Sequence, residues 1–110
     1  MHDEYWDEVD QIKPEFHLAA AEWRERTMFV SSVSQLSDDP AMRRIVELGR
    51  LAVPLLLTEL RTNPDQLCIA LHEITGENPV PAEHYGHLSE IAKAWLLWGD
   101  ENEYLEEYRP

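Results

Sequence analysis

The chain has 110 residues, and 44% of them are hydrophobic, which is enough for a modest core. We therefore expect a single domain over residues 1–110. The formal net charge is −13, and five of the first ten and five of the last eleven residues are acidic. Acidic ends repel a phosphate backbone, so the charge disfavours direct nucleic-acid binding and favours a basic protein partner.

The sequence also bears on compartment. It holds no apolar run near the ~20 residues needed to cross a bilayer, and it starts with acidic rather than basic residues. We expect a soluble cytoplasmic protein that does not contact a membrane. The single cysteine, Cys68, has no internal disulfide partner and stands between Leu67 and Ile69. A buried, reduced thiol is the expectation.

The N-terminal third predicts two helices and a connection. Apolar residues recur at spacings of four and three over residues 2–12, which predicts a helix there. Pro14 predicts a boundary, because the residue before a proline avoids helical geometry, and a second helix is expected from Pro14 to about residue 28. Four serines in residues 30–37 lower helix propensity, so this stretch is expected to be only partly helical.

The centre of the chain predicts two helices separated by a tight turn. Asp39 precedes a proline and is a typical helix N-cap, opening a helix over 39–48. Gly49 is suited to the left-handed conformation that ends a helix. Pro54 suits the first turn of the next helix, expected over 52–62. Both helices have an apolar face, and we expect these two faces to pack on each other.

A further helix is expected over 64–75, with Asn63 as its cap, Gln66 completing a capping box, and Gly76 as its end. Apolar residues lie on more than one side of this helix. We therefore expect it to be the most buried helix of the protein.

The last part of the chain predicts one more long helix. Residues 77–81 contain two prolines and are expected to be extended, with a short helical turn over 81–85. The long helix is expected over 87–98, ended by Gly99. Its final apolar residues exceed what a single buried stripe needs, so the C-terminal residues or a partner should cover them.

Several of these motifs resemble a known family. Leu48–Gly49, Ala52 to Pro54 and the leucines up to Leu60 look like the junction of a HEAT-type repeat, in which two antiparallel helices meet at a tight turn. Over residues 23–99 the chain resembles small bacterial HEAT-like proteins that have no assigned activity. The wider resemblance is carried by Trp23, Pro40, Ile45 to Gly49, Val53–Pro54, Ile74 to Pro79 and Trp95 to Gly99.

Together these observations predict an all-α protein of about five to six helices. The resemblance implies antiparallel helical hairpins stacked as a short HEAT-like α-solenoid, a right-handed superhelix. Residues 39–48 and 52–62 would form one hairpin, and residues 64–75 and 87–98 the other. The remaining helices would cap the stack, which such repeats require.

No residue pattern in the chain indicates a catalytic or metal site more strongly than it indicates an ordinary structural role. Glu83, His84 and His87 could share a metal ion, but Gly86 weakens a helix there and no other cluster completes the site. His72 has only the neighbouring Glu73 as a candidate partner, and no nucleophile lies at a motif spacing. Cys68 has apolar neighbours, which disfavours a reactive thiol. We expect no catalysis, no metal and no cofactor.

The aromatic residues near the acidic ends are more numerous than a small core needs. We interpret Trp23 and Trp95 as core, and the others as helix-end covers or as anchors in an acidic rim. The favoured function is a protein-interaction module for a basic partner, such as a nucleic-acid-binding protein or a toxin. The alternatives are a homodimer closed by Leu97 and Trp98 and a metal-dependent enzyme. The candidate partner-binding residues are Trp6, Asp7, Trp98, Glu101, Tyr104 and Tyr108.

Overall fold

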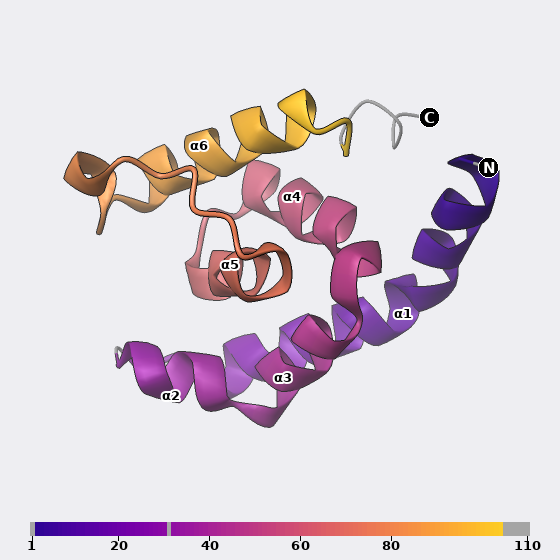
Figure 1. The fold of residues 1–110 in the computed structure, drawn as a ribbon. Coiled ribbons are helices and arrows are strands. Elements are labelled where there is room, and N and C mark those ends of the chain that lie inside the picture. The colour runs from indigo at the N-terminus through magenta and orange to yellow at the C-terminus, as the bar shows by residue number, and fades with distance from the viewer. Residues whose placement is uncertain (1, 31, 105–110) are drawn as a thin grey trace.

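The computed structural model describes residues 2–30 and 32–104, and over these residues all of its regular secondary structure is helical (Figure 1). The all-α prediction is therefore confirmed for this part of the chain. Six α-helices are connected by turns and three short 3₁₀ helices. Their bounds are α1 His2–Arg26, α2 Val33–Asp38, α3 Pro40–Glu47, η1 Gly49–Ala52, α4 Val53–Thr62, η2 Gln66–Cys68, α5 Ile69–Thr75, η3 Ala82–His84 and α6 Leu88–Glu101.

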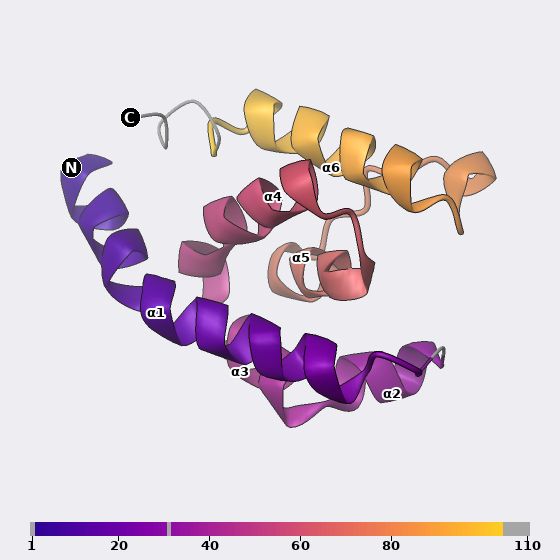
Figure 2. The same ribbon diagram turned by 180° about the vertical axis from the view of Figure 1, so that it is seen from behind.

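The helices form two antiparallel pairs with a short helix between them. α1 packs against α3, α4 packs against α6, and α5 contacts both α3 and α4. The two views show that the members of each pair run in opposite directions (Figures 1 and 2). The buried apolar residues form one cluster, to which every α-helix contributes. No helix within the described residues is both long and apolar enough to cross a bilayer.

The expected boundary at Pro14 is wrong, because α1 continues through this residue from His2 to Arg26. An interior proline costs about 3 kcal/mol. Val9 and Phe16 lie on either side of it, and both are completely buried. Burial of each contributes about 1.5–3 kcal/mol, so packing on both sides outweighs the lost hydrogen bond. The helix bends along its length (Figure 2), as expected for a helix with an internal proline.

The ends of α3 and the start of α4 lie where the sequence predicted them. The Asp39 carboxylate accepts a hydrogen bond from the Ala41 amide at 2.8 Å, as an N-cap does. Gly49 has a φ of +69° and ends the helix, and Pro54 lies in the first turn of α4. The main neighbours are different from those expected, because α3 packs on α1 and α5 whereas α4 packs on α6. The additional turn of η1 separates α3 from α4.

The most buried helix is α4, so the prediction that the helix over 64–75 would be most buried is wrong. Six of the ten residues of α4 are buried, including every residue from Val53 to Leu57. α5 has seven residues, and His72 and Glu73 on it are exposed. α4 has α6, α5 and α1 as neighbours, whereas α5 is shorter and keeps one side open to solvent.

The predicted cap at Asn63 is also wrong. Asn63 ends α4 instead, and Asp65 caps the following helical segment by accepting a hydrogen bond from the Leu67 amide at 3.0 Å. Arg24 of α1 donates to the same carboxylate at 2.8 Å. This tertiary contact holds Asp65 in the capping position, two residues later than the local pattern suggested.

Gly99 does not end the last helix, which continues to Glu101. A Cβ atom at position 99 would lie 2.5 Å from Cδ1 of Leu57, which is completely buried on α4. Gly99 therefore permits α6 to lie close to α4, and its role is packing rather than helix termination.

Candidate protein-interaction surface

The positive charges of the protein are mostly used in internal ion pairs. Six of the eight lysines and arginines in the described residues lie within 4 Å of a carboxylate. Arg24 of α1 contacts both Glu59 and Asp65 at 2.8 Å, and Arg26 donates two hydrogen bonds to Asp39 at 2.7 and 2.9 Å. These pairs hold α1 against the helices that follow it, so few cations remain to balance the acids.

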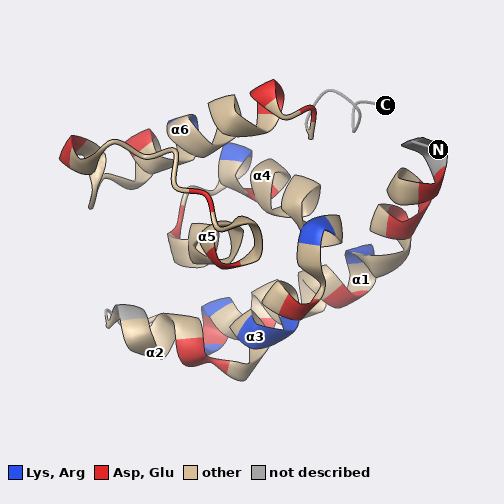
Figure 3. Ribbon diagram, in the orientation of Figure 1, with Lys and Arg blue, Asp and Glu red and all other residues tan. Residues whose placement is uncertain are grey.

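Arginines of α3 form further pairs of this kind with α1 and α5. Arg44 reaches Glu22 at 2.6 Å, and Arg43 reaches Glu73 on α5 at 2.6 Å. Blue segments in Figure 3 gather where α3 faces the end of α1, which is where most of these pairs lie. These ion-paired arginines therefore stabilise the contacts between helices and do not form a basic surface.

Acidic residues occur on the first turns of α1 and at the end of α6, among other places (Figure 3), and those named below are exposed. On α1 they share one face, at spacings of three and four residues. Among the described residues, none of them lies within ion-pair distance of a lysine or arginine. The set is Glu4, Asp7 and Glu8 on α1, with Asp100, Glu101 and Glu103 at the other site.

Arg50 of η1 connects these two acidic segments. Its carbonyl oxygen accepts a hydrogen bond from the Tyr5 hydroxyl at 2.7 Å, and its Nη1 donates to the Tyr104 hydroxyl at 2.9 Å. Burial raises the pKa of Tyr5, and the nearby Tyr104 adds to this effect, so Tyr5 stays a neutral donor. The start of α1 and Tyr104, which follows α6, are thereby hydrogen-bonded to the same turn.

We call Arg50 and the two segments that it joins, residues 4–8 of α1 and residues 98–104 at the end of α6, the junction. Its aromatic side chains pack on one another. Tyr104 stacks on Trp98 with ring centres 5.4 Å apart, and Trp98 meets Trp95 edge to face at 5.3 Å. Tyr5 meets Trp6 edge to face at 5.0 Å. Trp95 is buried in the core, as predicted. The rings closest to the acidic segments are therefore in fixed orientations.

The structure places five of the six candidate partner-binding residues around this junction. Asp7 and Glu101 are exposed, whereas Trp6, Trp98 and Tyr104 are half-buried and pack against the core. Tyr108 lies outside the described residues. The sequence reasoning missed Arg50, because a single arginine after a helix-ending glycine carries no local signal for contacts 45 and 54 residues away.

Tyr104→Phe is expected to lower the free energy of unfolding by about 0.5–1.5 kcal/mol, the usual contribution of one hydrogen bond. The phenyl ring still stacks on Trp98, so only the bond to Arg50 is lost. Chemical denaturation followed by tryptophan fluorescence measures the change. Arg50→Met is the control, because it removes the guanidinium but keeps the Arg50 carbonyl oxygen that accepts from Tyr5. In that background Tyr104→Phe should cause no further loss, and a loss as large as in the wild type would contradict a specific role for the Arg50 connection.

The histidines noted in the sequence do not gather with other ligands. Among the described residues, no group of three or more His, Cys, Asp or Glu side chains is arranged to hold a metal ion. Nδ1 of His72 lies 2.9 Å from the Glu77 carbonyl oxygen, a local contact that closes the end of α5. His84 is half-buried beside α6, and His87 is exposed.

Cys68 is buried, which agrees with the sequence-based expectation. Burial raises the pKa of its thiol to about 11, and the charge of Asp65 acts in the same direction.

We expect the thiol of Cys68 in the folded protein to react with a disulfide reagent about 100-fold more slowly than an ordinary thiol at neutral pH, since the thiolate is the reacting form. Reaction monitored by absorbance, with the denatured protein as control, measures this. Rapid reaction of the folded protein would contradict it.

No family model matches the sequence, and neither a curated protein nor a solved structure is significantly similar to it. The described residues define an all-α protein. Its acidic, aromatic junction joins the start of the first helix to the end of the last helix. The HEAT-like resemblance of the central motifs stays a prediction.

Proposed function

We propose that this protein is a non-catalytic interaction module that binds a basic protein partner through its acidic and aromatic junction. The observation that supports this is the distribution of charge. Six of the eight described lysines and arginines pair with carboxylates of the same chain, whereas exposed carboxylates such as Glu4, Asp7 and Glu101 have no partner among the described residues. A basic partner would neutralise these carboxylates without breaking any contact that holds the helices together.

The proposal includes a HEAT-like architecture in a bacterial cytoplasmic protein. The antiparallel pairs α1/α3 and α4/α6, with α5 between them, support a short stack of helical hairpins. The paired helices are different from those that the sequence suggested. In such a right-handed stack the inner faces form the core, and the outer helices and their ends are left for recognition.

The partner class follows from the same electrostatics. A protein surface rich in lysine and arginine, such as that of a nucleic-acid-binding protein or toxin, carries charges spaced to meet phosphates. Carboxylates on one face of α1 present a similar row of negative charges to such a surface. The protein would neutralise or escort such a partner, and it would not bind nucleic acid or a membrane itself.

The test is binding of the protein encoded by the adjacent gene, measured by pull-down and calorimetry at about 50 mM and about 500 mM salt, because exposed charges are screened over this range. We expect affinity to fall steeply at high salt. The variant with Glu4, Asp7 and Glu8 all changed to the amide residues should bind more weakly, and Glu15→Gln, on the same helix, serves as control. A partner retained equally at both salt concentrations would overturn the electrostatic proposal.

A second candidate function is a self-associating structural subunit. Leu97 on α6 is 61% exposed and lies next to Trp98, an arrangement that a second copy could cover. Light scattering of the purified protein distinguishes the two functions. A dimer that Leu97→Asp dissociates would support this candidate, and a strict monomer at all concentrations would exclude it.

A further inference from the structure

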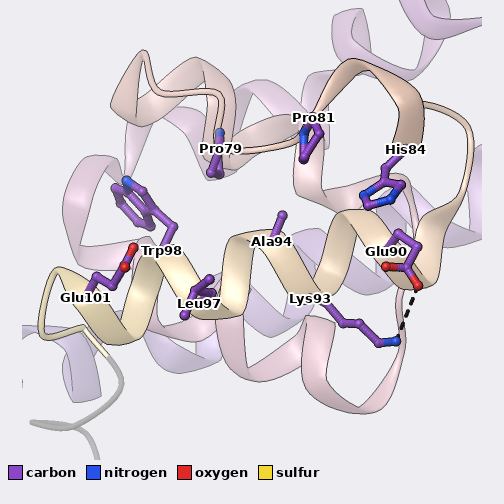
Figure 4. A pocket seen from close by; sticks show the side chains of 9 residues that line it. All are labelled: Pro79, Pro81, His84, Glu90, Lys93, Ala94, Leu97, Trp98 and Glu101. Atoms are coloured by element: carbon purple, nitrogen blue, oxygen red, sulfur yellow. Dashed lines mark hydrogen bonds and ion pairs between the residues drawn. The ribbon is translucent and has the colours of Figure 1, made fainter.

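A groove of about 330 Å³ runs along the outer face of α6 (Figure 4). One wall is the segment that connects α5 to α6, and the other is a strip of α6 whose residues recur at spacings of three and four. The lining is apolar at its centre and charged at its ends. Its lining includes Pro79 and Pro81 from the connection and Ala94, Leu97, Trp98 and Glu101 from α6.

The wall formed by the connection is held in place without any ligand. The Asn78 side-chain amide donates to the Tyr85 hydroxyl at 2.9 Å, and its carbonyl oxygen accepts from the Val80 amide at 3.4 Å. Val80 itself is buried in the core. These contacts fix Pro79 and Pro81 opposite α6, so the groove is formed before a partner binds and costs little ordering entropy.

The backbone around the groove offers few hydrogen-bond donors. Pro79 and Pro81 have no N–H group, and the amides of α6 are used within the helix. An incoming chain therefore cannot extend a β-sheet along this wall. Recognition must come from side chains, as when an amphipathic segment places apolar anchors into a groove.

The charges beside the groove indicate which segment fits. Glu90 at one end is paired with Lys93 at 3.3 Å. Glu101 at the other end is exposed, and no described lysine or arginine pairs with it. Asp100 and Glu103 lie close to it in the chain. A basic residue therefore finds an unpaired carboxylate at the Glu101 end, next to the apolar centre.

We propose that this groove binds an amphipathic segment of a basic partner, with a large apolar side chain against Leu97 and Pro81 and a lysine or arginine against Glu101. The inference rests on the proposed function and adds the place and chemistry of recognition. A second copy of this chain is a poorer occupant, because each copy carries a net charge of −13.

The experiment is selection from a phage-displayed library of random linear peptides on the wild-type protein, followed by titration of the enriched peptides. We expect enriched peptides to combine a large apolar residue with lysine or arginine. Leu97→Asp should weaken their binding about tenfold or more, as for a hot-spot anchor. Leu18→Asp is the matched control, since Leu18 on α1 is 62% exposed and Leu97 is 61% exposed.

A second variant tests the charge. Glu101→Gln should weaken binding about two- to fivefold and reduce its salt dependence, whereas Glu15→Gln should leave both unchanged. Thermal melts of all variants verify that each one folds. The groove proposal is overturned if no peptide is enriched, if the enriched peptides lack basic residues, or if Leu97→Asp binds them like wild type. A dimer that Leu97→Asp dissociates would also overturn it, because the occupant would be a second copy.

The result can be separated from that of the proposed function. If the adjacent gene product binds in a salt-dependent way but is insensitive to Leu97→Asp and Glu101→Gln, the groove inference fails and the interaction module stands. If no protein partner binds in a salt-dependent way but basic peptides occupy the groove, the proposal of an interaction module for a basic protein fails instead.

Discussion

Leu57→Ala is expected to lower the free energy of unfolding by about 2–5 kcal/mol, the range for removing a buried leucine side chain. Leu57 is completely buried on α4 and lies beneath Gly99 of α6. Its removal leaves a cavity at the α4–α6 contact, which holds the groove-bearing helix on the core. Chemical denaturation followed by the fluorescence of the four tryptophans measures the loss. A loss below that of an exposed leucine, such as Leu18, would contradict the assigned packing.

The contact between Leu57 and Gly99 predicts that Gly99→Ala lowers the free energy of unfolding when leucine is at position 57 and raises it when alanine is there. Alone, the new methyl group would lie 2.5 Å from Cδ1 of Leu57, and such overpacking costs about 1–3 kcal/mol. Alanine regains about 1 kcal/mol of helix propensity, so the single variant is expected to be modestly less stable. In the Leu57→Ala background the clash is absent, and Gly99→Ala should then stabilise the protein. A double-mutant cycle measures the coupling between the two positions.

The control for this cycle is Gly49→Ala. Gly49 has a φ of +69°, which a residue with a Cβ adopts only under strain, and its Cβ would meet no atom within 4 Å. Its cost should therefore be the same with leucine or alanine at position 57. Simple additivity of Leu57→Ala and Gly99→Ala would contradict the close approach of α6 to α4.

The boundaries that the sequence predicted correctly depend on local chemistry. Asp39 caps α3 through an amide two residues away, and Gly49 and Gly76 both adopt positive φ where a helix ends. Each of these features involves only the residue itself and its immediate neighbours. A single sequence carries that information in full, so these helix ends could be placed before the structure was known.

The incorrect predictions all concern residues whose role is set by distant contacts. Pro14 stays within α1 because Val9 and Phe16 are buried on both sides of it. Gly99 continues α6 because Leu57 leaves no room for a side chain there. Asp65 replaces Asn63 as the cap because Arg24 reaches it from α1. In each case tertiary packing overrode the local preference.

The candidate interaction residues also divide into features set by local sequence and features set by distant contacts. Counting acids and aromatics in the sequence marked the two ends of the chain as unusual. It could not show that Arg50 joins them, or that Trp98 and Tyr104 stack and become half-buried. The groove between α6 and Pro79 was missed as well, since one of its walls is placed by the burial of Val80 in the core. Of its lining residues, Leu97, Trp98 and Glu101 had been singled out from the sequence, but for other reasons.

Asp39→Ala is expected to lower the free energy of unfolding by about 1 kcal/mol from the lost N-cap alone. The loss should be larger because the bidentate contact with Arg26, at 2.7 and 2.9 Å, is removed too. Asp39→Asn separates the two effects, since asparagine also caps helices but carries no charge. We expect its cost to lie between those of wild type and Asp39→Ala, as measured by urea denaturation at neutral pH.

The cost of Asp39→Asn should disappear in acid. The hydrogen bonds from Arg26, and to a smaller extent the one from the Ala41 amide, lower the pKa of Asp39 in the folded protein. Its charge therefore stabilises the fold above the unfolded carboxyl pKa of about 3.9, and this contribution is lost as pH falls through the lower folded pKa. Other carboxylates also titrate, so the quantity to follow is the difference between wild type and Asp39→Asn, with Asp38→Asn, a change at the exposed neighbour, as control. A difference that grows as pH falls would mean that the Asp39 charge opposes folding, in conflict with the contact to Arg26.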